Sequence, residues 1–327
     1  MKCKFRTMLC LALWLPVIGA NAAQSVAPNY PERPIRFIVP QSPGGATDLV
    51  GRMVAAMLSE RLGGPIVVDN RPGAATIVGT EIAARAYPDG YTLLMVPSSF
   101  AILPSMGKKL PFDPVKDFIP ISTLSTYPNV VLLRLTMPVN SIKELIALAK
   151  AKPGTINFAS GGVGTGTHLG AELFDAMAGV KMVHVPYKGG GPANNALLGG
   201  QVDLQFTPMP TALPLIKAGR LKGIAVSSAK RSTLLPNLPT VAESGVPGYE
   251  QTTWNGLLVP VRTPPAIVNK LSAELNAALK MPSTQERFAA SGLEPGGMSN
   301  KEFAAMIKRE ISKWGKLIRD LGITPGE

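Results

Sequence analysis

The chain has 327 residues and a formal net charge of +12, with 46% hydrophobic and only 6% aromatic residues. This length allows one or two domains with sizeable hydrophobic cores. The positive charge is spread along the chain and lacks the interleaved aromatics of a nucleic-acid-binding face, so we expect no nucleic-acid partner. A positive field instead favours encounter with anionic solutes.

Residues 1–22 have the features of a cleavable export signal. Basic residues precede an apolar run of about eleven residues, which is too short to span a bilayer. Ala20 and Ala22 supply the small residues that a signal peptidase recognises, so we expect cleavage near Ala22 and an exported mature chain. Cys3 and Cys10 both lie in this segment, which excludes disulfides and thiol chemistry after cleavage.

From residue 35 onward, the hydrophobic pattern predicts alternating strands and helices. In the first part we expect strands at 35–39, 65–69 and 91–96, with helices at 49–58 and 76–86. After a proline-marked stretch at 104–120 we expect strands at 155–159, 181–186, 202–207 and 221–227, with helices at 141–150, 167–178, 191–199 and 211–218. Each set is typical of a mostly parallel sheet flanked by helices, so the fold class is α/β.

A further strand at 252–259 precedes two helices that have no strand unit of their own to cover. Pro264 begins the first of them, and the second has an apolar face formed by Phe303, Ile307, Ile311, Trp314, Ile318 and Leu321. We expect both helices to fold back onto the first unit. The prediction is therefore a two-lobed protein with lobe 1 at 30–127 plus 253–327 and lobe 2 at 128–252. Hinge crossings are expected near 127–133 and 248–256.

Two glycine-rich loops follow predicted strands and open predicted helices, at 41–48 and 160–168. Backbone N–H groups that converge at a helix start can hold an anion without a charged side chain. The first loop is also compatible with a plain tight turn. The second has the order Gly-x-Gly-x-Gly, which differs from the dinucleotide fingerprint Gly-x-Gly-x-x-Gly, so nucleotide binding is the weaker interpretation.

A third loop, at 185–192, follows another predicted strand and places Tyr187 beside three glycines. Catalytic motifs are scarce by comparison. His168 and His184 lie on different predicted elements, with no acid at metal-ligand spacing, so we expect no metal site. The sequence has no Gly-x-Ser-x-Gly elbow. We therefore name no catalytic residue and no cofactor.

Several motifs in chain order give the sequence a family resemblance. They are Pro31-Glu32-Arg33-Pro34-Ile35, Pro43-Gly44-Gly45-Ala46-Thr47-Asp48, Asn70-Arg71-Pro72-Gly73-Ala74, Pro88-Asp89-Gly90-Tyr91-Thr92, Gly164-Thr165-Gly166-Thr167-His168-Leu169, His184-Val185-Pro186-Tyr187-Lys188-Gly189, Leu238-Pro239-Thr240-Val241-Ala242-Glu243 and Trp254-Asn255-Gly256. Together they span essentially the whole mature chain. The chain resembles the substrate-binding proteins of tripartite tricarboxylate transporters, the Bordetella-uptake-gene (Bug/TctC-type) family of periplasmic receptors.

The resemblance implies a Venus-flytrap fold that holds a small organic carboxylate between its lobes. Gln41 and Ser42 depart from the family pattern, where many members have an aromatic and a small residue. The residues expected to bind ligand are Ser42, Gly44, Gly45, Ala46, Thr47, Asp48, Ser98, Ser160, Gly161, Gly162, Gly164, Thr165, Gly166, Thr167, His168, Tyr187, Thr207 and Trp254. Trp254 fits ordinary packing near a hinge at least as well.

The resemblance also implies the partners. The expected function is a periplasmic, monomeric solute-binding protein that delivers an organic acid to the membrane permease of such a transporter. A receptor that presents its ligand to a sensor kinase has the same site and stays open as an alternative. An exported enzyme that acts on carboxylates is the third interpretation, although no sequence feature favours it. The ligand itself, whether dicarboxylate, tricarboxylate, aromatic acid or amino acid, is not specified by these motifs.

Overall fold

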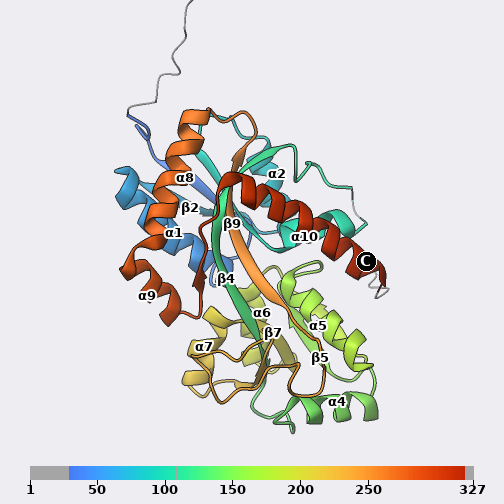
Figure 1. Ribbon diagram of the computed structural model, residues 1–327. Helices are drawn as coiled ribbons and strands as arrows, with labels where there is room; N and C mark the ends of the chain where they lie inside the picture. Colours follow the sequence, from blue (N-terminus) through green and yellow to red (C-terminus); the bar gives the residue numbers. More distant parts are fainter. Residues whose placement is uncertain (1–28, 108, 321–327) are drawn as a thin grey trace, which may run out of the picture.

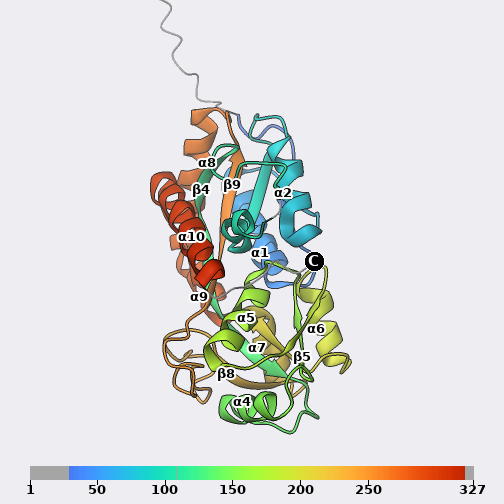
Figure 2. The same ribbon diagram turned by 90° about the vertical axis from the view of Figure 1, so that its right-hand side faces the viewer.

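The computed structural model describes residues 29–107 and 109–320, which form two lobes joined along a pair of long strands (Figure 1). The expected export signal at 1–22, both cysteines and Leu321 lie outside this part of the chain. Within it, no helix is long and apolar enough to cross a membrane. The view in Figure 2 separates the same two lobes from the side.

Lobe 1 contains a mixed sheet with helices on both faces (Figures 1 and 2). Its strands, in spatial order, are β2 (Ile66–Asn70), β1 (Ile35–Val39), β3 (Thr92–Pro97), β9 (Thr252–Pro260), β4 (Phe118–Leu133) and β10 (Glu294–Pro295). Its helices are α1 (Ala46–Leu62), α2 (Ile77–Ala84), α3 (Ser99–Ile102), α8 (Pro265–Lys280), α9 (Pro282–Ala290) and α10 (Asn300–Asp320), with short 3₁₀ turns η1 (Ala74–Thr76) and η2 (Leu103–Ser105).

Lobe 2 repeats the same plan on a smaller scale. The C-terminal part of β4 pairs with β7 (Leu204–Pro208) and β8 (Lys222–Val226), and β7 continues to β5 (Asn157–Ser160) and β6 (Val183–Pro186). The helices of this lobe are α4 (Ile142–Ala151), α5 (Gly166–Ala178), α6 (Gly190–Leu198) and α7 (Met209–Lys217). Ser141 caps α4, with its hydroxyl accepting a hydrogen bond from the Glu144 N–H at 3.2 Å.

The two sheets are mixed rather than mostly parallel, which corrects the sequence-based expectation. Strands β1 to β3 and β5 to β7 pair in parallel, whereas every pairing of β4 and β9 is antiparallel. β4 was not predicted: its first residues fall in the proline-marked stretch at 104–120, and no strand was expected at 121–133. Pro120 lies at a register shift against β9, and Pro128 is the last residue that pairs with β9 before β7 becomes the partner. Proline is tolerated in strands at such irregular positions.

The chain passes between the lobes within β4, at Pro128 and Asn129, and again at the start of β9. Figure 1 shows β4 and β9 running side by side along the long axis of the molecule. That these passages act as hinges, and the lobe boundaries that we expected, stay predictions. At Pro128 and Asn129 the strand paired with β4 changes from β9 to β7.

The helices at the C-terminus pack on lobe 1, as predicted. α8 contacts α1 and β4, with Ile267, Leu271, Leu275 and Leu279 buried along one face. α10 contacts β4 and α3 and buries Phe303, Ile307, Trp314 and Ile318, whereas Ile311 is only half-buried. The last turns of α10 also reach lobe 2, where Trp314 and Ile318 share an apolar cluster with Leu169 of α5.

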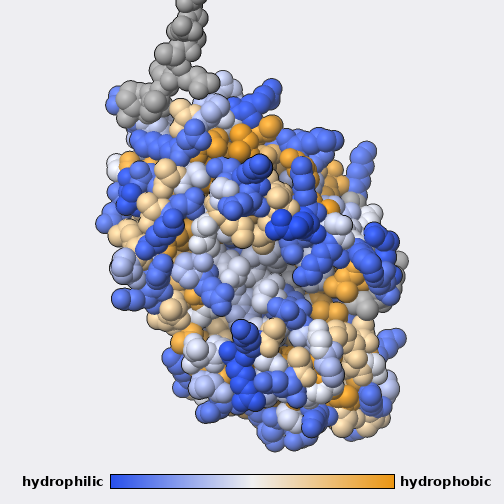
Figure 3. Space-filling model, in the orientation of Figure 1, coloured by the Kyte–Doolittle hydropathy of each residue, from blue (hydrophilic) through white to orange (hydrophobic). Residues whose placement is uncertain are grey.

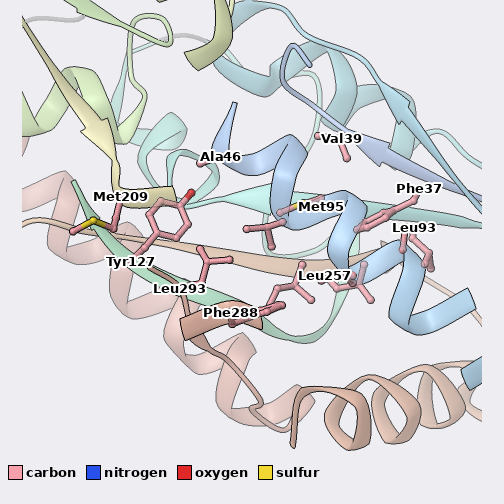
Figure 4. Packing of buried hydrophobic residues seen from close by; sticks show 14 of the residues in the cluster. Phe37, Val39, Ala46, Leu93, Met95, Tyr127, Met209, Leu257, Phe288 and Leu293 are labelled. Atoms are coloured by element: carbon pink, nitrogen blue, oxygen red, sulfur yellow. The ribbon is translucent and has the colours of Figure 1, made fainter. Parts of the chain in front are cut away.

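A large apolar cluster lies between the lobe 1 sheet and α1 and continues toward lobe 2 (Figure 4). Phe37, Leu93 and Leu257 are fully buried in it, and Met209 of α7 extends it across the lobe boundary. Hydrophilic and hydrophobic residues are interspersed on the face shown in Figure 3. The core thus fixes the edges of both sheets that carry the loops described next.

Candidate functional site

A small cavity of about 40 Å³, with several hydroxyl side chains in its lining, lies between the lobes. Both lobes contribute to its lining, which comprises Gln41, Ala46, Thr47, Pro97, Ser98, Ser99, Tyr127, Gly161, Thr165, Gly166, Thr167, Gly190, Pro208, Thr211 and Thr253. No charged side chain is among these described residues. The cavity therefore relies on backbone dipoles and hydroxyl groups for any interaction with an anion.

Two helices from different lobes begin at this cavity. α1 starts with Ala46 and Thr47 in lobe 1, and α5 starts with Gly166 and Thr167 in lobe 2; all four residues line the cavity. The first N–H groups of a helix have no partner within the helix and carry a partial positive charge. Two such ends that face one cavity form a site suited to an anion, and in particular to a carboxylate.

The glycine loops support these helix starts instead of offering their own N–H groups. The Gly44 N–H donates to Asp48 Oδ2 at 3.0 Å. In the second loop, three glycine N–H groups donate to side chains of the same loop or of α5: Gly161 to Thr167 Oγ1 at 2.9 Å, Gly162 to Ser160 Oγ at 3.0 Å and Gly164 to His168 Nδ1 at 3.2 Å. These four glycine N–H groups are already used, so an anion held here depends on the N–H groups at the two helix starts, and the ligand roles predicted for these glycines stay predictions.

The carboxylate of Asp48 holds the first loop in place through several hydrogen bonds. Besides Gly44, its carboxylate accepts hydrogen bonds from Arg52 Nε at 3.1 Å and Asn70 Nδ2 at 2.9 Å. Burial alone would raise the pKa of Asp48, but these donors outweigh it and hold the pKa below its usual value. Asp48 is thus an ionised, internally satisfied group at neutral pH, and it lies outside the lining of the small cavity.

Hydroxyl groups complete the cavity. The Ser99 Oγ is buried and has no hydrogen-bond partner among the described residues. The Tyr127 hydroxyl accepts a hydrogen bond from Asn255 Nδ2 at 3.1 Å and is hydrogen-bonded to Thr47. Burial raises the pKa of Tyr127 to about 12, so it stays a neutral phenol. A buried hydroxyl without a partner costs free energy that a ligand can recover.

A second, larger cavity of about 220 Å³ adjoins the first, with Gln41 and Gly161 shared between the two linings. Its walls are mostly apolar. The lining comprises Pro40, Gln41, Pro72, Gly73, Ala74, Ala75, Thr76, Ile77, Leu103, Met106, Leu110, Gly161, Gly162, Val163, Tyr187, Lys188 and Gly189. Ala74, Ala75 and Thr76 have φ values of 43°, 54° and 91°, an uncommon backbone for non-glycine residues that forms part of the wall.

A third hollow, a groove of about 690 Å³, lies between α1 and the helices α6 and α7. Four predicted ligand residues line this groove, namely Ser42, Gly44, Gly45 and Asp48. The lobes touch beside it. The Ser42 hydroxyl donates to the Lys188 carbonyl, and a Cβ placed on Gly191 would lie only 2.5 Å from the Pro43 carbonyl oxygen.

Ser160 and His184 form the one serine–histidine hydrogen bond among the described residues, a pairing that some enzymes use to activate a nucleophile. Ser160 Oγ lies 2.6 Å from His184 Nε2, but Ser160 is fully buried and also accepts the Gly162 N–H. The His184 ring stacks on His168, with ring centroids 4.0 Å apart. Burial and His168 lower the pKa of His184 to about 3. Neither residue lines any of the three hollows, and the hydrogen bonds of Ser160 hold the loop that precedes α5.

The structure divides the predicted ligand residues into four groups. Ala46, Thr47, Ser98, Gly161, Thr165, Gly166 and Thr167 line the small cavity, while Gly162 and Tyr187 line the apolar one. Ser42, Gly44, Gly45 and Asp48 line the groove beside the contact between lobes. Ser160, Gly164, His168, Thr207 and Trp254 line none of the three hollows.

Trp254 and Thr207 lie outside the three hollows, but Trp254 Nε1 and Thr207 Oγ1 are buried and have no hydrogen-bond partner among the described residues, so a ligand role for them stays a prediction. Trp254 is 4% exposed and packs edge-on against Phe303 of α10, with ring centroids 5.7 Å apart. Thr207 is fully buried in β7. Conversely, the sequence interpretation missed Tyr127, Gly190, Thr211 and Thr253 as lining residues. Tyr127 and Thr253 fall in the predicted crossing ranges. Because a crossing segment lies between the two lobes, this position could have indicated them as lining residues.

Within residues 29–107 and 109–320, no group of three or more histidine, cysteine or acidic side chains is arranged to hold a metal ion. Two mixed α/β lobes, two connecting strands and an interlobe cavity formed by paired helix starts define a two-lobed solute-binding protein.

Comparison with known proteins identifies the family. The model of the tripartite tricarboxylate transporter family receptor matches residues 50–323. The chain is 37% identical over 319 residues to Protein BugT of Bordetella pertussis, covering 97% of this chain and 98% of that protein. The chain therefore belongs to the tripartite tricarboxylate transporter receptor family, as the sequence motifs predicted.

Two solved structures extend the comparison to the fold. R. palustris Rpa4515 with adipate has a TM-score of 0.88 and 34% identity, covering 91% of this chain and 100% of that chain. MatC (Rpa3494) from Rhodopseudomonas palustris with bound malate has a TM-score of 0.84 and 30% identity, covering 88% and 100%. The predicted two-lobed fold is confirmed by these similarities.

Proposed function

We propose that this chain captures a small organic acid between its lobes in the periplasm and delivers it to the permease of a tripartite tricarboxylate-type transporter. The carboxylate occupies the small cavity, where it accepts hydrogen bonds from the N–H groups at the starts of α1 and α5. Contacts to both lobes then stabilise the arrangement in which the lobes touch, which is how a ligand drives domain closure.

The observation that supports the proposal most is the convergence of two helix starts, one from each lobe, on a cavity without charged side chains. Neutral donors can bind an anion strongly when they are preorganised and shielded from water. The two relatives with bound adipate and malate are receptors of the same fold with organic acids as ligands. A receptor needs no reaction, and the buried Ser160–His184 pair fits that role.

Thermal unfolding of the mature chain tests the proposal. We expect at least one compound among acetate, benzoate, adipate, malate and citrate to raise the Tm, because a ligand that binds only the native state stabilises it. Glucose and choline should leave the Tm unchanged. A Tm shift with glucose or choline and none with any acid would refute carboxylate binding.

A substitution in the α5 start locates the site. In Thr167→Val the hydroxyl that accepts the Gly161 N–H is lost at constant volume, so the second loop no longer supports the helix start. We expect at least a tenfold loss of affinity for the stabilising acid, which is about 1.4 kcal/mol. Thr155→Val is the matched control, because its hydroxyl bonds only to the exposed Lys152 carbonyl, far from the cavity. Equal affinities in both variants would contradict the assigned position.

A further inference from the structure

The two adjoining cavities differ in the side chains that line them. The small cavity provides helix starts and hydroxyls, while the larger one is walled by apolar side chains such as Leu103, Met106 and Val163. Because Gln41 and Gly161 belong to both linings, a molecule seated by its carboxylate in the first would extend into the second.

The described lining of the larger cavity has no buried charged side chain that could pair with a second carboxylate of the ligand. Among the described residues in its lining, Lys188 is the only charged one, and its side chain is exposed. The nearby Arg71 is paired with Asp69 at 2.9 Å and lies outside the lining. A carboxylate placed against the apolar wall would lose its hydration without gaining a counterion, which is strongly unfavourable.

Three neutral polar side chains, those of Gln41, Thr76 and Tyr187, are among the described residues that line this cavity. Thr76 Oγ1 is buried and has no hydrogen-bond partner among the described residues, and Thr76 lines the larger cavity. It can satisfy a single hydroxyl or carbonyl group on a ligand. The size is also informative, because an apolar cavity of about 150 Å³ accommodates benzene. The volume of about 220 Å³ therefore suits a substituted ring or a chain of similar bulk.

We infer that the ligand class of this chain is an organic acid with one carboxylate and an uncharged, mainly apolar body, bound with the carboxylate at the helix starts and the body in the larger cavity. This inference rests on the proposed function and narrows it. It separates this chain from the relatives with bound adipate and malate, which are both dicarboxylic acids. In the described part of this chain, the wall around Leu110 and Val163 has no charged side chain that could pair with a second carboxylate.

Two matched pairs of acids test the inference by titration calorimetry on the full mature chain. The pairs are hexanoate with adipate and 4-methylbenzoate with terephthalate; each pair differs at the far end, where a methyl group replaces a carboxylate. We expect the monocarboxylate of each pair to bind at least ten times more tightly. Equal or tighter binding of the dicarboxylates would overturn this inference and leave the proposed function in place. If no carboxylate binds, both fail.

A charge-introducing variant places the body of the ligand. Val163→Lys adds a cation to the wall of the larger cavity, so we expect the preference to move at least tenfold toward the dicarboxylate of each pair. Leu110→Lys tests the same wall if Val163→Lys does not fold. Val115→Lys is the control, because Val115 is exposed and lines none of the cavities, and it should leave the ratio unchanged. An unchanged ratio in the wall variants would contradict the assignment.

Discussion

At the scale of single residues, side chains in the second loop control which backbone groups are free. Thr167 Oγ1 accepts the Gly161 N–H at 2.9 Å and is hydrogen-bonded to Thr165 Oγ1 at 3.0 Å. His168 Nδ1 holds the Gly164 N–H in the same way. The glycines therefore provide the turn, with Gly164 at a φ of 80°, while the threonines fix its shape. The N–H groups at the start of α5 remain available for a ligand.

The amino-acid sequence indicates where this loop lies, but it does not determine which hydrogen bonds the loop forms. The spacing of Gly161, Gly164 and Gly166 predicts a turn before a helix, because glycine alone adopts such backbone angles easily. Which N–H group points to a ligand and which to a neighbouring hydroxyl depends on side-chain positions set by the lobe as a whole. His184, which supports Ser160 from another strand, belongs to this nonlocal information.

His184 makes stability depend on pH. Burial and His168 hold its pKa at about 3 in the folded state, against about 6.5 when unfolded. The unfolded chain therefore binds more protons between these values, so the contribution of His184 to stability is lost as the pH falls from about 6.5 toward 3. Substitution by a residue that does not titrate removes this term.

The expected result concerns His184→Phe, which keeps an aromatic ring in the stack on Phe158. The variant should lose about 1 kcal/mol at pH 7.5 through the missing hydrogen bond to Ser160, and its stability should fall less steeply on acidification than that of the wild type. Asp175, whose pKa burial raises to about 7, acts in the opposite direction in both proteins and cancels in the difference. Urea unfolding at pH 7.5, 6.0 and 4.5 measures the two slopes; parallel slopes would show that His184 does not titrate as described.

At the scale of elements, β4 is the element that local sequence signals describe least well. Helices with strong periodicity, such as α10, were predicted with most of their buried face. β4 was missed, and its two prolines sit where the strand shifts register and changes partner. α9 and β10 were missed as well, since they are short and gain their structure from packing beside α8 and β4.

α10 is anchored on lobe 1 by one aromatic side chain. Phe303 is fully buried and lies so close to Gly256 of β9 that a Cβ there would come within 2.1 Å of the Phe303 ring. We expect Phe303→Ala to reduce the free energy of unfolding by about 3–5 kcal/mol, because a large ring leaves a cavity against Trp254.

Lys308→Ala on the same helix is the control, since Lys308 is exposed and should change stability by less than about 0.5 kcal/mol. Urea denaturation followed by circular dichroism measures both variants. A loss below about 1 kcal/mol for Phe303→Ala would mean that α10 is not held through this contact.

At the scale of the whole molecule, one of the contacts between the lobes is formed mainly by main-chain atoms. Gly189, Gly190 and Gly191 of lobe 2 lie against Ser42, Pro43, Gly44 and Gly45 of lobe 1. Because glycine has no side chain, the two main chains can approach each other closely. This contact belongs to the arrangement of lobes in which the proposed ligand is enclosed, so changes there should affect closure before they affect folding.

Gly191→Ala tests the contact, because its Cβ would lie 2.5 Å from the Pro43 carbonyl oxygen. Alanine suits the α6 helix better than glycine, so lobe 2 itself should not be weakened. We expect at least a tenfold loss of affinity for the stabilising acid and a larger radius of gyration in its presence, measured by small-angle X-ray scattering. Gly190→Ala, whose Cβ would have 3.7 Å of room, should stay as compact as the wild type. If Gly191→Ala matches the wild type in both quantities, the contact does not govern closure.

The central claim is that a carboxylate is held by two helix starts, one from each lobe. The most direct measurement is a crystal structure of the mature chain with the acid that raises its Tm most. The account predicts carboxylate oxygens within about 3.2 Å of backbone nitrogens at the starts of both α1 and α5, with the rest of the molecule toward Leu103 and Val163. A carboxylate bound instead in the groove beside Arg52 and Arg220, or held by one lobe alone, would contradict it.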